Sequence, residues 1–412
     1  MPNKDKNIPK RRFKAFENAD AWELRKLGEF VDKAVDNRGK TPPLDEEGTH
    51  PLIEVAALGG VHPDYTKIDK YLNDESFENN LRSYIKKDDI LFTTVGSIGL
   101  VSLMDSREEA AIAQNIVAFR AKDNFVPSYL YSLFTNKENQ LKAIRIVMGA
   151  VQPSIKVSQL VDVEYMLTQN RFEQKAIGTF FSTLDRQITL HQRKLDKLKN
   201  VKQAYLSEMF PAEGERVPKR RFPGFTDDWE LRKLGDIGEI VTGSTPPVAN
   251  PEYYSSDTGI PWITPTDIET NIISDSAKKL SVEGAKVGRV VQANSILCTC
   301  IASIGKNALL TTIGSFNQQI NALTPYPNND SYFLLTSSEL WSIQMKQIAS
   351  SGTMQIINKT EFSELRTMIP SLPEQEAIGT FFSALDQQIT LHQRKLEKLK
   401  NLKKALLNEL FV

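Results

Sequence analysis

The chain has 412 residues, of which 40% are hydrophobic and 25% are charged, and 51 lysines and arginines balance 51 aspartates and glutamates. This composition is that of an ordinary globular protein of about two to four domains. A net charge of zero excludes a globally basic surface, so any nucleic-acid surface must be local. The N-terminal MPNKDKNIPKRRF lacks the apolar core of a signal peptide, and no apolar run approaches the roughly 18 residues of a membrane span. We therefore expect a cytoplasmic protein without a membrane segment.

The first domain is expected at 1–169, with a flexible basic N-terminus to about residue 20. The β-branched run DDILFTTVGSIGLVSLM (88–104) is broken by a Ser-Ile-Gly turn, and the strand-like IAQNIVAFRA follows it. The next segment, VPSYLYSLFTNKENQLKAIRI, has helical periodicity. These patterns predict a mixed α/β domain of the α+β class.

A long helix is predicted at 170–210. Asn170 and Glu173 have the spacing of a capping box, and Pro211 follows the last turn. Apolar positions alternate in steps of four and three, which is the period of a coiled coil. The seam is formed by Ile177, Phe181, Leu184, Ile188, His191, Leu195 and Leu198, and the same spacing continues through Lys202, Tyr205 and Met209.

A linker (211–226) leads to a second domain at 227–370 with the same succession of patterns. NSILCTCIASIGKNALL (294–310) is again a β-branched run broken by Ser-Ile-Gly, and SYFLLTSSELWSIQMKQIA is again helical. Cys298 and Cys300 are the only cysteines, and neighbours at this spacing on a strand bridge poorly. We expect both to be small buried residues in a reducing compartment.

A second long helix is predicted at 371–412, and 29 of the 38 residues at 374–411 are identical to those at 173–210. We expect the two helices to pair as an antiparallel coiled coil within the chain, with pseudo-twofold symmetry. The central histidines either fix the register of this coil or are partly exposed at a tolerant position. The second seam is formed by Ile378, Phe382, Leu385, Ile389, His392, Leu396 and Leu399, and continues through Lys403, Leu406 and Leu410.

The two domains share only short segments. PKRRF, WELRKLG and SIG each occur twice, and GKTPP (39–43) corresponds to GSTPP (243–247). The sequences match Gln152 with Gln355 and Lys156 with Lys359, and almost nothing is shared between these points. The organisation is a variable domain and a constant helix, each present twice.

The sequence contains no phosphate-binding loop, no dinucleotide fingerprint and no histidine at metal-ligand spacing, so we expect neither catalytic residues nor a metal site. The glycine-bearing loops offer N–H groups, hydroxyls and lysines that suit a phosphate, although they are equally compatible with plain turns. The candidate DNA-binding residues are Lys40, Thr41, Thr94, Ser97, Gln152, Lys156, Ser244, Thr245, Ser303, Lys306, Gln355 and Lys359.

The duplicated FFS-LD-QITLHQRKL helix, WELRKLG, FPGFTDDWE and the DILF–GSIG strand together resemble the specificity (S) subunits of type I restriction–modification enzymes over essentially the whole chain. The resemblance implies two target recognition domains, each recognising one half of an asymmetric bipartite site in double-stranded DNA. It also implies a coiled coil that sets the spacer and docks two methyltransferase (M) subunits.

The resemblance further implies that this chain is non-catalytic and holds no cofactor. S-adenosylmethionine would belong to adenine-N6 methyltransferase partners, and ATP and Mg²⁺ to restriction (R) subunits bound through the methyltransferase core. Two alternatives stay open: a self-sufficient DNA-modifying enzyme, and a coiled-coil scaffold without a DNA role.

Overall fold

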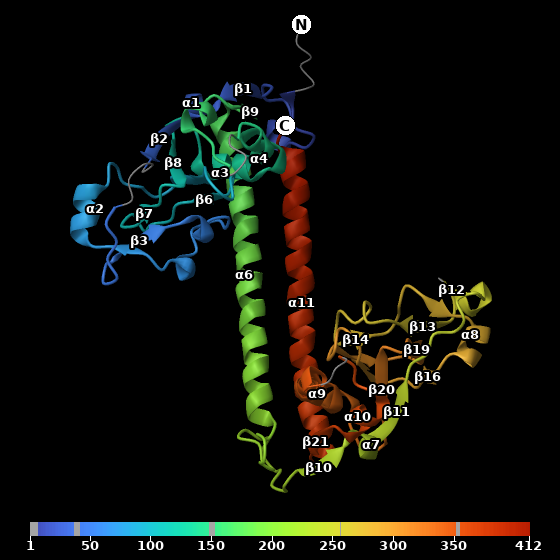
Figure 1. The fold of residues 1–412 in the computed structure, drawn as a ribbon. Helices are drawn as coiled ribbons and strands as arrows, with labels where there is room; N and C mark the ends of the chain where they lie inside the picture. Colours follow the sequence, from blue (N-terminus) through green and yellow to red (C-terminus); the bar gives the residue numbers. More distant parts are fainter. Residues whose placement is uncertain (1–6, 37–41, 148–152, 256, 352–354) are drawn as a thin grey trace. The chain divides into compact units, whose positions relative to one another are not determined.

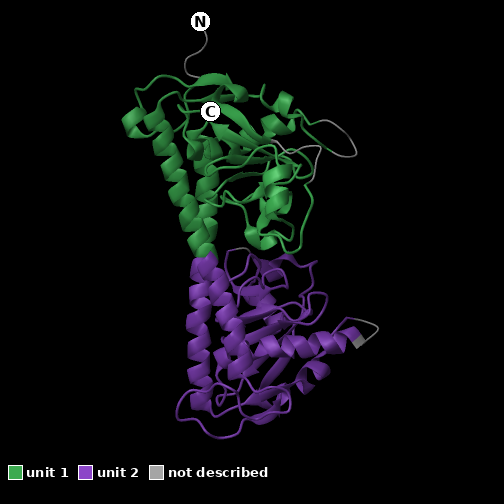
Figure 2. Cartoon of the chain, turned by 90° about the vertical axis from the view of Figure 1, so that its left-hand side faces the viewer, with its two compact units in different colours: residues 1–192, 394–412 green, residues 193–393 purple. Residues whose placement is uncertain are grey.

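The computed structural model describes residues 7–36, 42–147, 153–255, 257–351 and 355–412. The chain forms two compact units: unit 1 contains residues 1–192 and 394–412, and unit 2 contains residues 193–393 (Figure 2). Each unit holds one globular domain and one half of each long helix, because α6 (Arg171–Met209) and α11 (Leu372–Leu410) both pass from one unit into the other (Figure 1). Both unit boundaries fall at the same point of the repeated helix sequence.

The globular domain of unit 1 is built on a four-stranded antiparallel sheet in the order β2-β8-β5-β6. Its strands are β2 (Val31–Asp36), β5 (Ile90–Thr93), β6 (Val101–Leu103) and β8 (Ile116–Ala121). A three-stranded sheet has the order β4-β3-β7, and β1 pairs with β9. These smaller strands are β1 (Glu23–Lys26), β3 (His50–Ile53), β4 (Tyr71–Leu72), β7 (Ala111–Ile112) and β9 (Glu164–Leu167).

Helices of unit 1 cover the sheet and join it to the long helices. The short helices are α1 (Leu27–Phe30), α2 (Asp74–Asn80), α3 (Pro127–Thr135), α4 (Lys137–Ile144) and α5 (Val157–Leu160), with 3-10 turns at Lys14–Phe16, Val55–Ala57 and Tyr65–Lys67. The core contains Trp22 and Phe119 from the domain, Phe181 from α6 and Phe411 just after α11. One continuous apolar core therefore fixes the domain to the helix pair of its own unit.

The globular domain of unit 2 has two five-stranded sheets, in the orders β11-β20-β17-β18-β14 and β12-β15-β13-β19-β16, and the pair β10-β21. The first sheet contains β11 (Gly238–Thr242), β14 (Ile272–Ile273), β17 (Ser295–Thr299), β18 (Asn307–Leu310) and β20 (Ile320–Pro325). The second contains β12 (Tyr254–Ser255), β13 (Ile260–Ile263), β15 (Lys279–Leu280), β16 (Val290–Val291) and β19 (Gly314–Phe316). The pair is formed by β10 (Glu230–Lys233) and β21 (Arg366–Ile369).

The remaining helices of unit 2 are α7 (Leu234–Ile237), α8 (Val282–Val287), α9 (Ser331–Ser351) and α10 (Lys359–Glu364), with a 3-10 turn at Pro251–Tyr253. The core contains Trp229 and Trp341 of the domain together with Met209 of α6 and Phe382 of α11. Cys298 and Cys300 are free and buried, and burial raises the pKa of Cys300 to about 12. Within the described residues, no helix combines the length and apolarity needed to cross a membrane.

The long helices run antiparallel to each other in each unit. In unit 1, Phe181 stacks on Phe411 with ring centroids 6.1 Å apart. Asp185, one turn later on α6, forms an ion pair with Lys403, two turns earlier than Phe411 on α11. In unit 2, Tyr205 contacts the ring of Phe381 with centroids 4.9 Å apart, and the earlier residue Lys202 bonds the later Asp386. The predicted antiparallel pairing is therefore present in both units.

The predicted seam positions are all buried or half-buried. Phe181 and Phe382 are fully buried, His392 is 4% exposed and His191 is half-buried. The neighbouring Leu190 lies off the seam and is 56% exposed. The period of 3.5 therefore marks the buried face correctly.

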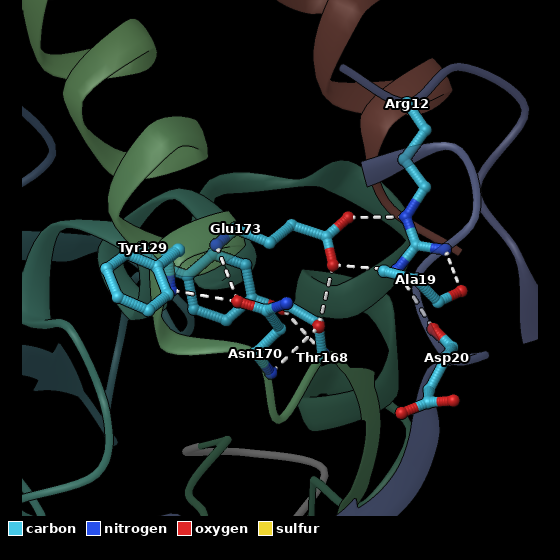
Figure 3. Close-up of polar contacts among 8 residues, drawn as sticks. Arg12, Ala19, Asp20, Tyr129, Thr168, Asn170 and Glu173 are labelled. Carbon is cyan, nitrogen blue, oxygen red and sulfur yellow. Dashed lines mark hydrogen bonds and ion pairs between the residues drawn. The ribbon is translucent and has the colours of Figure 1, made fainter. Parts of the chain in front are cut away.

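The first PKRRF segment is packed at the start of α6, which corrects the prediction of a flexible N-terminus for residues 7–20. Arg12 Nε and Nη2 donate to the two carboxylate oxygens of Glu173 at 2.6 and 2.8 Å (Figure 3). Thr168 Oγ1 donates to the same carboxylate at 2.7 Å, and Asn170 caps the helix as predicted. The hydrogen bond to Glu173 raises the pKa of Arg12. A buried carboxylate thus holds the basic segment in place.

The second PKRRF segment repeats this arrangement in unit 2. Arg221 donates to both carboxylate oxygens of Glu374 at 2.7 and 2.8 Å. The preceding arginine, Arg220, bonds Glu208 near the end of α6 at 2.5 Å. Each PKRRF segment therefore joins the start of one long helix to the end of the other within its unit, because Arg11 likewise bonds Glu409 at 2.6 Å in unit 1.

Candidate nucleic-acid interface

In each unit, loops that follow or precede neighbouring strands meet at one edge of the main sheet. In unit 2, β11 and β17 both pair antiparallel with β20, so their C-terminal ends lie beside the start of β20. Gly243 N–H donates to Ile320 O at 3.0 Å, and Cys300 N–H donates to Gln319 O at 2.7 Å. We call the loops 243–247, 300–306 and 317–319 the loop edge of unit 2.

The corresponding loops of unit 1 form a second loop edge. β2 and β5 pair antiparallel with β8, and Thr94 N–H donates to Asn115 O at 2.9 Å. Residues 94–100 and 113–115 make up the described part of this edge, because residues 37–41 after β2 lie outside the described residues. Lys40 and Thr41 are therefore not placed.

The Ser-Ile-Gly turn has the same construction in both domains. Thr93 Oγ1 donates to Ser97 O at 2.6 Å and accepts a bond from Leu100 N–H at 2.9 Å. Thr299 makes the same two bonds to Ser303 O and Lys306 N–H. The glycine of each turn has a φ of +84° or +87°, which favours glycine, so this residue is required by the backbone. The turn leaves Ser97, Ser303 and Lys306 exposed.

A second segment packs beside each turn and corrects the predicted matching of lysines. Ile155 N–H donates to Thr94 O, and Ile357 N–H donates to Cys300 O, both at 2.9 Å. Ile155 and Ile357 therefore occupy equivalent positions in the two domains. The next residues are Lys156 and Asn358, so the equivalent of Lys156 is Asn358 and not Lys359. The predicted equivalence of Lys156 and Lys359 is therefore wrong by one residue.

The predicted equivalence of Gln152 and Gln355 is not tested by the described residues. Gln355 is described and exposed, whereas Gln152 lies outside the described residues. Asn358 caps α10 through its side chain, accepting from Glu361 N–H at 3.0 Å. The lysines Lys156 and Lys359 are both exposed at the start of a short helix, one at the cap position and the other directly after it.

Two predicted residues have roles inside their loops. Thr94 is fully buried and its hydroxyl donates to Asn115 O at 3.2 Å, so it supports the edge and does not present its side chain to a ligand. Ser244 is half-buried, and its Oγ accepts from Arg289 N–H at 2.9 Å. Thr245 is exposed, and its hydroxyl donates to Gln318 Oε1 at 2.6 Å.

The sequence reasoning missed two glutamines at equivalent positions. Gln114 and Gln318 each precede the residue whose carbonyl closes the loop edge, and both are exposed. The sequence does contain a pattern that could have identified them, because AQN and NQQ each precede a buried strand. Neither segment was recognised as a repeated element. Glutamine can donate and accept at a base edge. Arg289, directly before β16, was missed as well.

The loop edge of unit 2, and in both units the segment packed beside the Ser-Ile-Gly turn, carry exposed lysines. Among the described residues, no carboxylate pairs with Lys156, Lys306 or Lys359. By contrast, Lys26 and Lys233 on the strands β1 and β10 each bond an acidic side chain, at 3.1 and 2.6 Å. Exposed lysines beside turns suit contacts with a phosphate backbone. In the described part of the chain, no three His, Cys, Asp or Glu side chains come together as a metal site.

Comparison with known proteins accounts for the duplicated architecture. The profile of the type I restriction modification DNA specificity domain matches residues 19–200 and 226–401, which together form most of the chain. The chain belongs to this family. It carries two copies of the family's domain, and each copy contains one loop edge and most of one long helix.

Two named relatives illustrate the extent of the similarity. The HindI type I restriction enzyme specificity subunit of Haemophilus influenzae is 28% identical over 217 residues, covering 50% of this chain but only 46% of that protein. A specificity subunit of Methanocaldococcus jannaschii named MjaX is 23% identical over 403 residues, covering 94% of this chain and 92% of the relative. The similarity to MjaX thus includes both domains and both helices.

A solved structure has the same fold. The crystal structure of a type I restriction–modification S subunit from M. genitalium matches with a TM-score of 0.71 at 16% identity, covering 98% of this chain and 99% of that one. The mixed α/β domains and the two long helices are thus a known arrangement of this family.

Proposed function

We propose that this chain is the DNA-recognising subunit of a type I restriction–modification complex, in which each domain binds one half of an asymmetric bipartite site. The observation that carries the proposal is the pair of loop edges, built by the same hydrogen bonds in two domains whose other residues have diverged. A shared backbone scaffold with different side chains is what two different half-sites require. Two identical domains would instead favour a palindrome.

The charge at the loop edges supports a division between positioning and recognition. Lys156, Lys306 and Lys359 can contact phosphates and set the register of the protein on DNA, while Gln114 and Gln318 can reach base edges. The net charge of the chain is zero, so its own electrostatic attraction to DNA is local. Partner subunits would supply further phosphate contacts.

The proposal assigns the chemistry to partner subunits. Two M subunits would bind S-adenosylmethionine and methylate an adenine in each half-site, which requires the base to leave the stack. R subunits, bound through the methyltransferase core, would use ATP and Mg²⁺ for cleavage. The family resemblance, and a sequence without nucleotide-binding loops, support a non-catalytic role for this chain.

The long helices are proposed to set the spacer between the half-sites and to dock the M subunits. Both helices pass from one unit to the other without a break, so two continuous helices connect the domains covalently. Leu190 and Leu391 occupy the same repeat position, and both are exposed, at 56% and 43%. Repeated apolar side chains on a helix surface suit two copies of one partner.

The proposal is tested by sequencing methylated adenines in cells that carry this chain with its M subunits. We expect one asymmetric motif with two defined segments and an undefined spacer, absent when the gene of this chain is deleted. Methylation that persists after deletion would contradict the proposal. If the pure chain transferred a labelled methyl group to DNA by itself, the self-sufficient enzyme would be correct. A chain that never binds DNA, even with M subunits, would be a scaffold.

A further inference from the structure

Arg289 is fixed beside the loop edge of unit 2 by two hydrogen bonds, one to the end of β11 and one to the loop after it. Its N–H donates to Ser244 Oγ at 2.9 Å, and its Nη1 donates to Thr242 O at 2.7 Å. The residue lies directly before β16, outside the main sheet, yet its two bonds attach it to the last residue of β11 and to the loop that follows. The guanidinium is therefore held beside the GSTPP loop.

The charge of Arg289 is exposed and has no carboxylate partner among the described residues. This distinguishes it from the structural arginines of the chain. Arg12 and Arg221 each bond both oxygens of a buried glutamate, and Arg120 bonds Asp89 at 2.7 Å. In Arg289, Nη1 donates to the backbone carbonyl of Thr242. Within the described part of the chain, Nε and Nη2 have no hydrogen-bond partner.

The loop bonded by Arg289 carries further hydrogen-bonding side chains. Thr245 directly follows Ser244, the loop residue that Arg289 bonds, and its hydroxyl donates to Gln318 Oε1 at 2.6 Å. Gln318 is exposed at the same edge. An arginine anchored through one nitrogen loses less conformational entropy on binding, and its remaining Nε and Nη2 form a planar fork.

We propose that Arg289 recognises a guanine in the half-site bound by the second domain, with its free fork on the O6 and N7 atoms. This inference rests on the proposed function and adds a specificity-determining residue to it. Arginine bound to these two acceptors is the commonest specific contact in the major groove. A free fork held in one orientation suits a bidentate contact, which arginine makes with guanine and with phosphate. We favour guanine because both domains need phosphate contacts, whereas only the second domain has an arginine at this position.

Among the described residues, the strand that follows Arg289 is found in the second domain only. β16 pairs with β19 at the end of the second sheet, whereas the described part of the corresponding sheet in unit 1 ends at β7. The turn lysines and edge glutamines follow elements that recur in both domains, but the strand after Arg289 does not. Five residues before the residue of positive φ that precedes the central strand (Asp88 or Asn294), unit 1 has Ser83 and unit 2 has Arg289. Arg289 is therefore a difference of side chain on a shared scaffold, as two different half-sites require.

The test uses the full chain with its M subunits and compares Arg289→Ala, Arg289→Lys and Lys286→Ala. Lys286 is a matched control, since it is an exposed cation three residues earlier that is paired with Glu283 at 2.6 Å. Methylated adenines are mapped by single-molecule sequencing, and binding is measured on the wild-type site and on sites with each base of the second half changed.

We expect Arg289→Ala to lose preference at one G·C pair of the second half-site, by roughly tenfold to a hundredfold. The first half-site and the spacer should stay unchanged. Arg289→Lys should not restore this preference, because lysine lacks the planar fork, although it keeps the charge and a donor for Thr242 O. Lys286→Ala should retain the wild-type motif. Equal melting temperatures would show that the variants are folded.

Three results would overturn the inference. Arg289→Ala could weaken binding to all sequences alike, with a smaller salt slope and full rescue by Arg289→Lys, which would make Arg289 a phosphate contact. The motif could stay unchanged in both Arg289 variants. The lost preference could instead fall in the first half-site. If the wild-type complex itself showed no bipartite motif, the proposed function would fail, and the inference with it.

Discussion

Lys202 of α6 and Asp386 of α11 form an ion pair across the helix pair of unit 2, with Nζ 2.8 Å from Oδ1. Lys202 also bonds Glu339 of α9 at 2.7 Å, and Asp386 accepts from Asn271 and Tyr332 at 3.1 Å each. The lysine occupies a seam position where a coiled coil ordinarily has an apolar residue. Side chains of both long helices, of α9 and of the loop before β14 therefore meet in one buried polar cluster.

The same pair recurs in unit 1 with the helices exchanged, where Lys403 of α11 lies 2.5 Å from Asp185 of α6. The two lysines are repeat equivalents, and so are the two aspartates. Each pair can form only when the helices run antiparallel in the observed register. A polar seam residue that demands one partner is a recognised way to specify register.

Replacing Lys202 with methionine should lower the free energy of unfolding by roughly 3–5 kcal/mol. Asp386 would remain 8% exposed without its cation, and an unpaired buried carboxylate is costly. The measurement is the midpoint of denaturant unfolding. Lys199→Met is the control, because Lys199 is exposed on the same helix half, and its effect should stay within about 0.5 kcal/mol. Equal effects of both substitutions would show that the pair contributes nothing.

The stabilising effect of Lys202 should also depend on pH. Burial lowers the pKa of Lys202, but Glu339 and Asp386 together more than offset this, so the pKa lies above its ordinary value of 10.5. The folded state then holds the proton more tightly than the unfolded state, and the stabilisation is complete below pH 10.5 and lost as the pH rises through the folded pKa. The difference in stability between wild type and Lys202→Met should shrink above pH 10.5. A constant difference up to pH 11.5 would refute the assignment.

Arg12→Met should destabilise unit 1 by roughly 3–5 kcal/mol, because Glu173 would stay buried without its bidentate partner. Arg11→Met gives the matched control. Arg11 is the adjacent arginine, but its side chain is 63% exposed in its pair with Glu409, and such pairs contribute only about 0–1 kcal/mol. Thermal unfolding of the two variants separates the roles. Similar losses for both would mean that the buried pair is no stronger than the surface one.

The parts of the fold that depend on local periodicity could be predicted from the sequence. The seam of α6 follows from apolar residues at a regular spacing within one helix, and the predicted bounds of 170–210 differ from Arg171–Met209 by one residue at each end. The Ser-Ile-Gly turn was also recognisable, since Gly99 and Gly305 are required by their backbone conformation. These features are encoded by neighbouring residues.

Features that join distant segments could not be predicted in the same way. PKRRF looks like a flexible basic segment until Glu173, 161 residues from Arg12, is placed beside it. The equivalence of Lys156 and Lys359 was predicted from residue identity alone, but the hydrogen bonds of Ile155 and Ile357 show which residues of the two domains are equivalent. Arg289 and Thr242 are 47 residues apart, and only the packing of β16 beside the β11 loop brings them together.

Lengthening both long helices should lengthen the spacer of the recognised site. One heptad is duplicated after Gln192 and another after Gln393, which are the repeat-related boundaries of the units, so neither unit is altered internally. Seven residues keep the 3.5 period and add about 10 Å of helix. At about 3.4 Å per base pair, the spacer should grow by roughly three base pairs, with both half-sites unchanged.

The control for this insertion carries the heptad in one helix only, which breaks the pairing and should abolish methylation. The outcome is obtained from the methylated motif of each variant. If the double insertion kept full methylation with the original spacer, the helices would not set the distance between half-sites. They would then serve only to dock the M subunits.

The central claim is that the two domains recognise DNA independently, and exchanging one domain tests it most directly. Residues 227–368 are replaced by the equivalent segment of a family member with a different second half-site, which keeps α6, α11 and the Arg221–Glu374 pair intact. Methylated adenines are then mapped in cells that carry the chimera and the native M subunits. The account predicts an unchanged first half-site and spacer, joined to the donor's second half-site. A motif in which both half-sites change would contradict it.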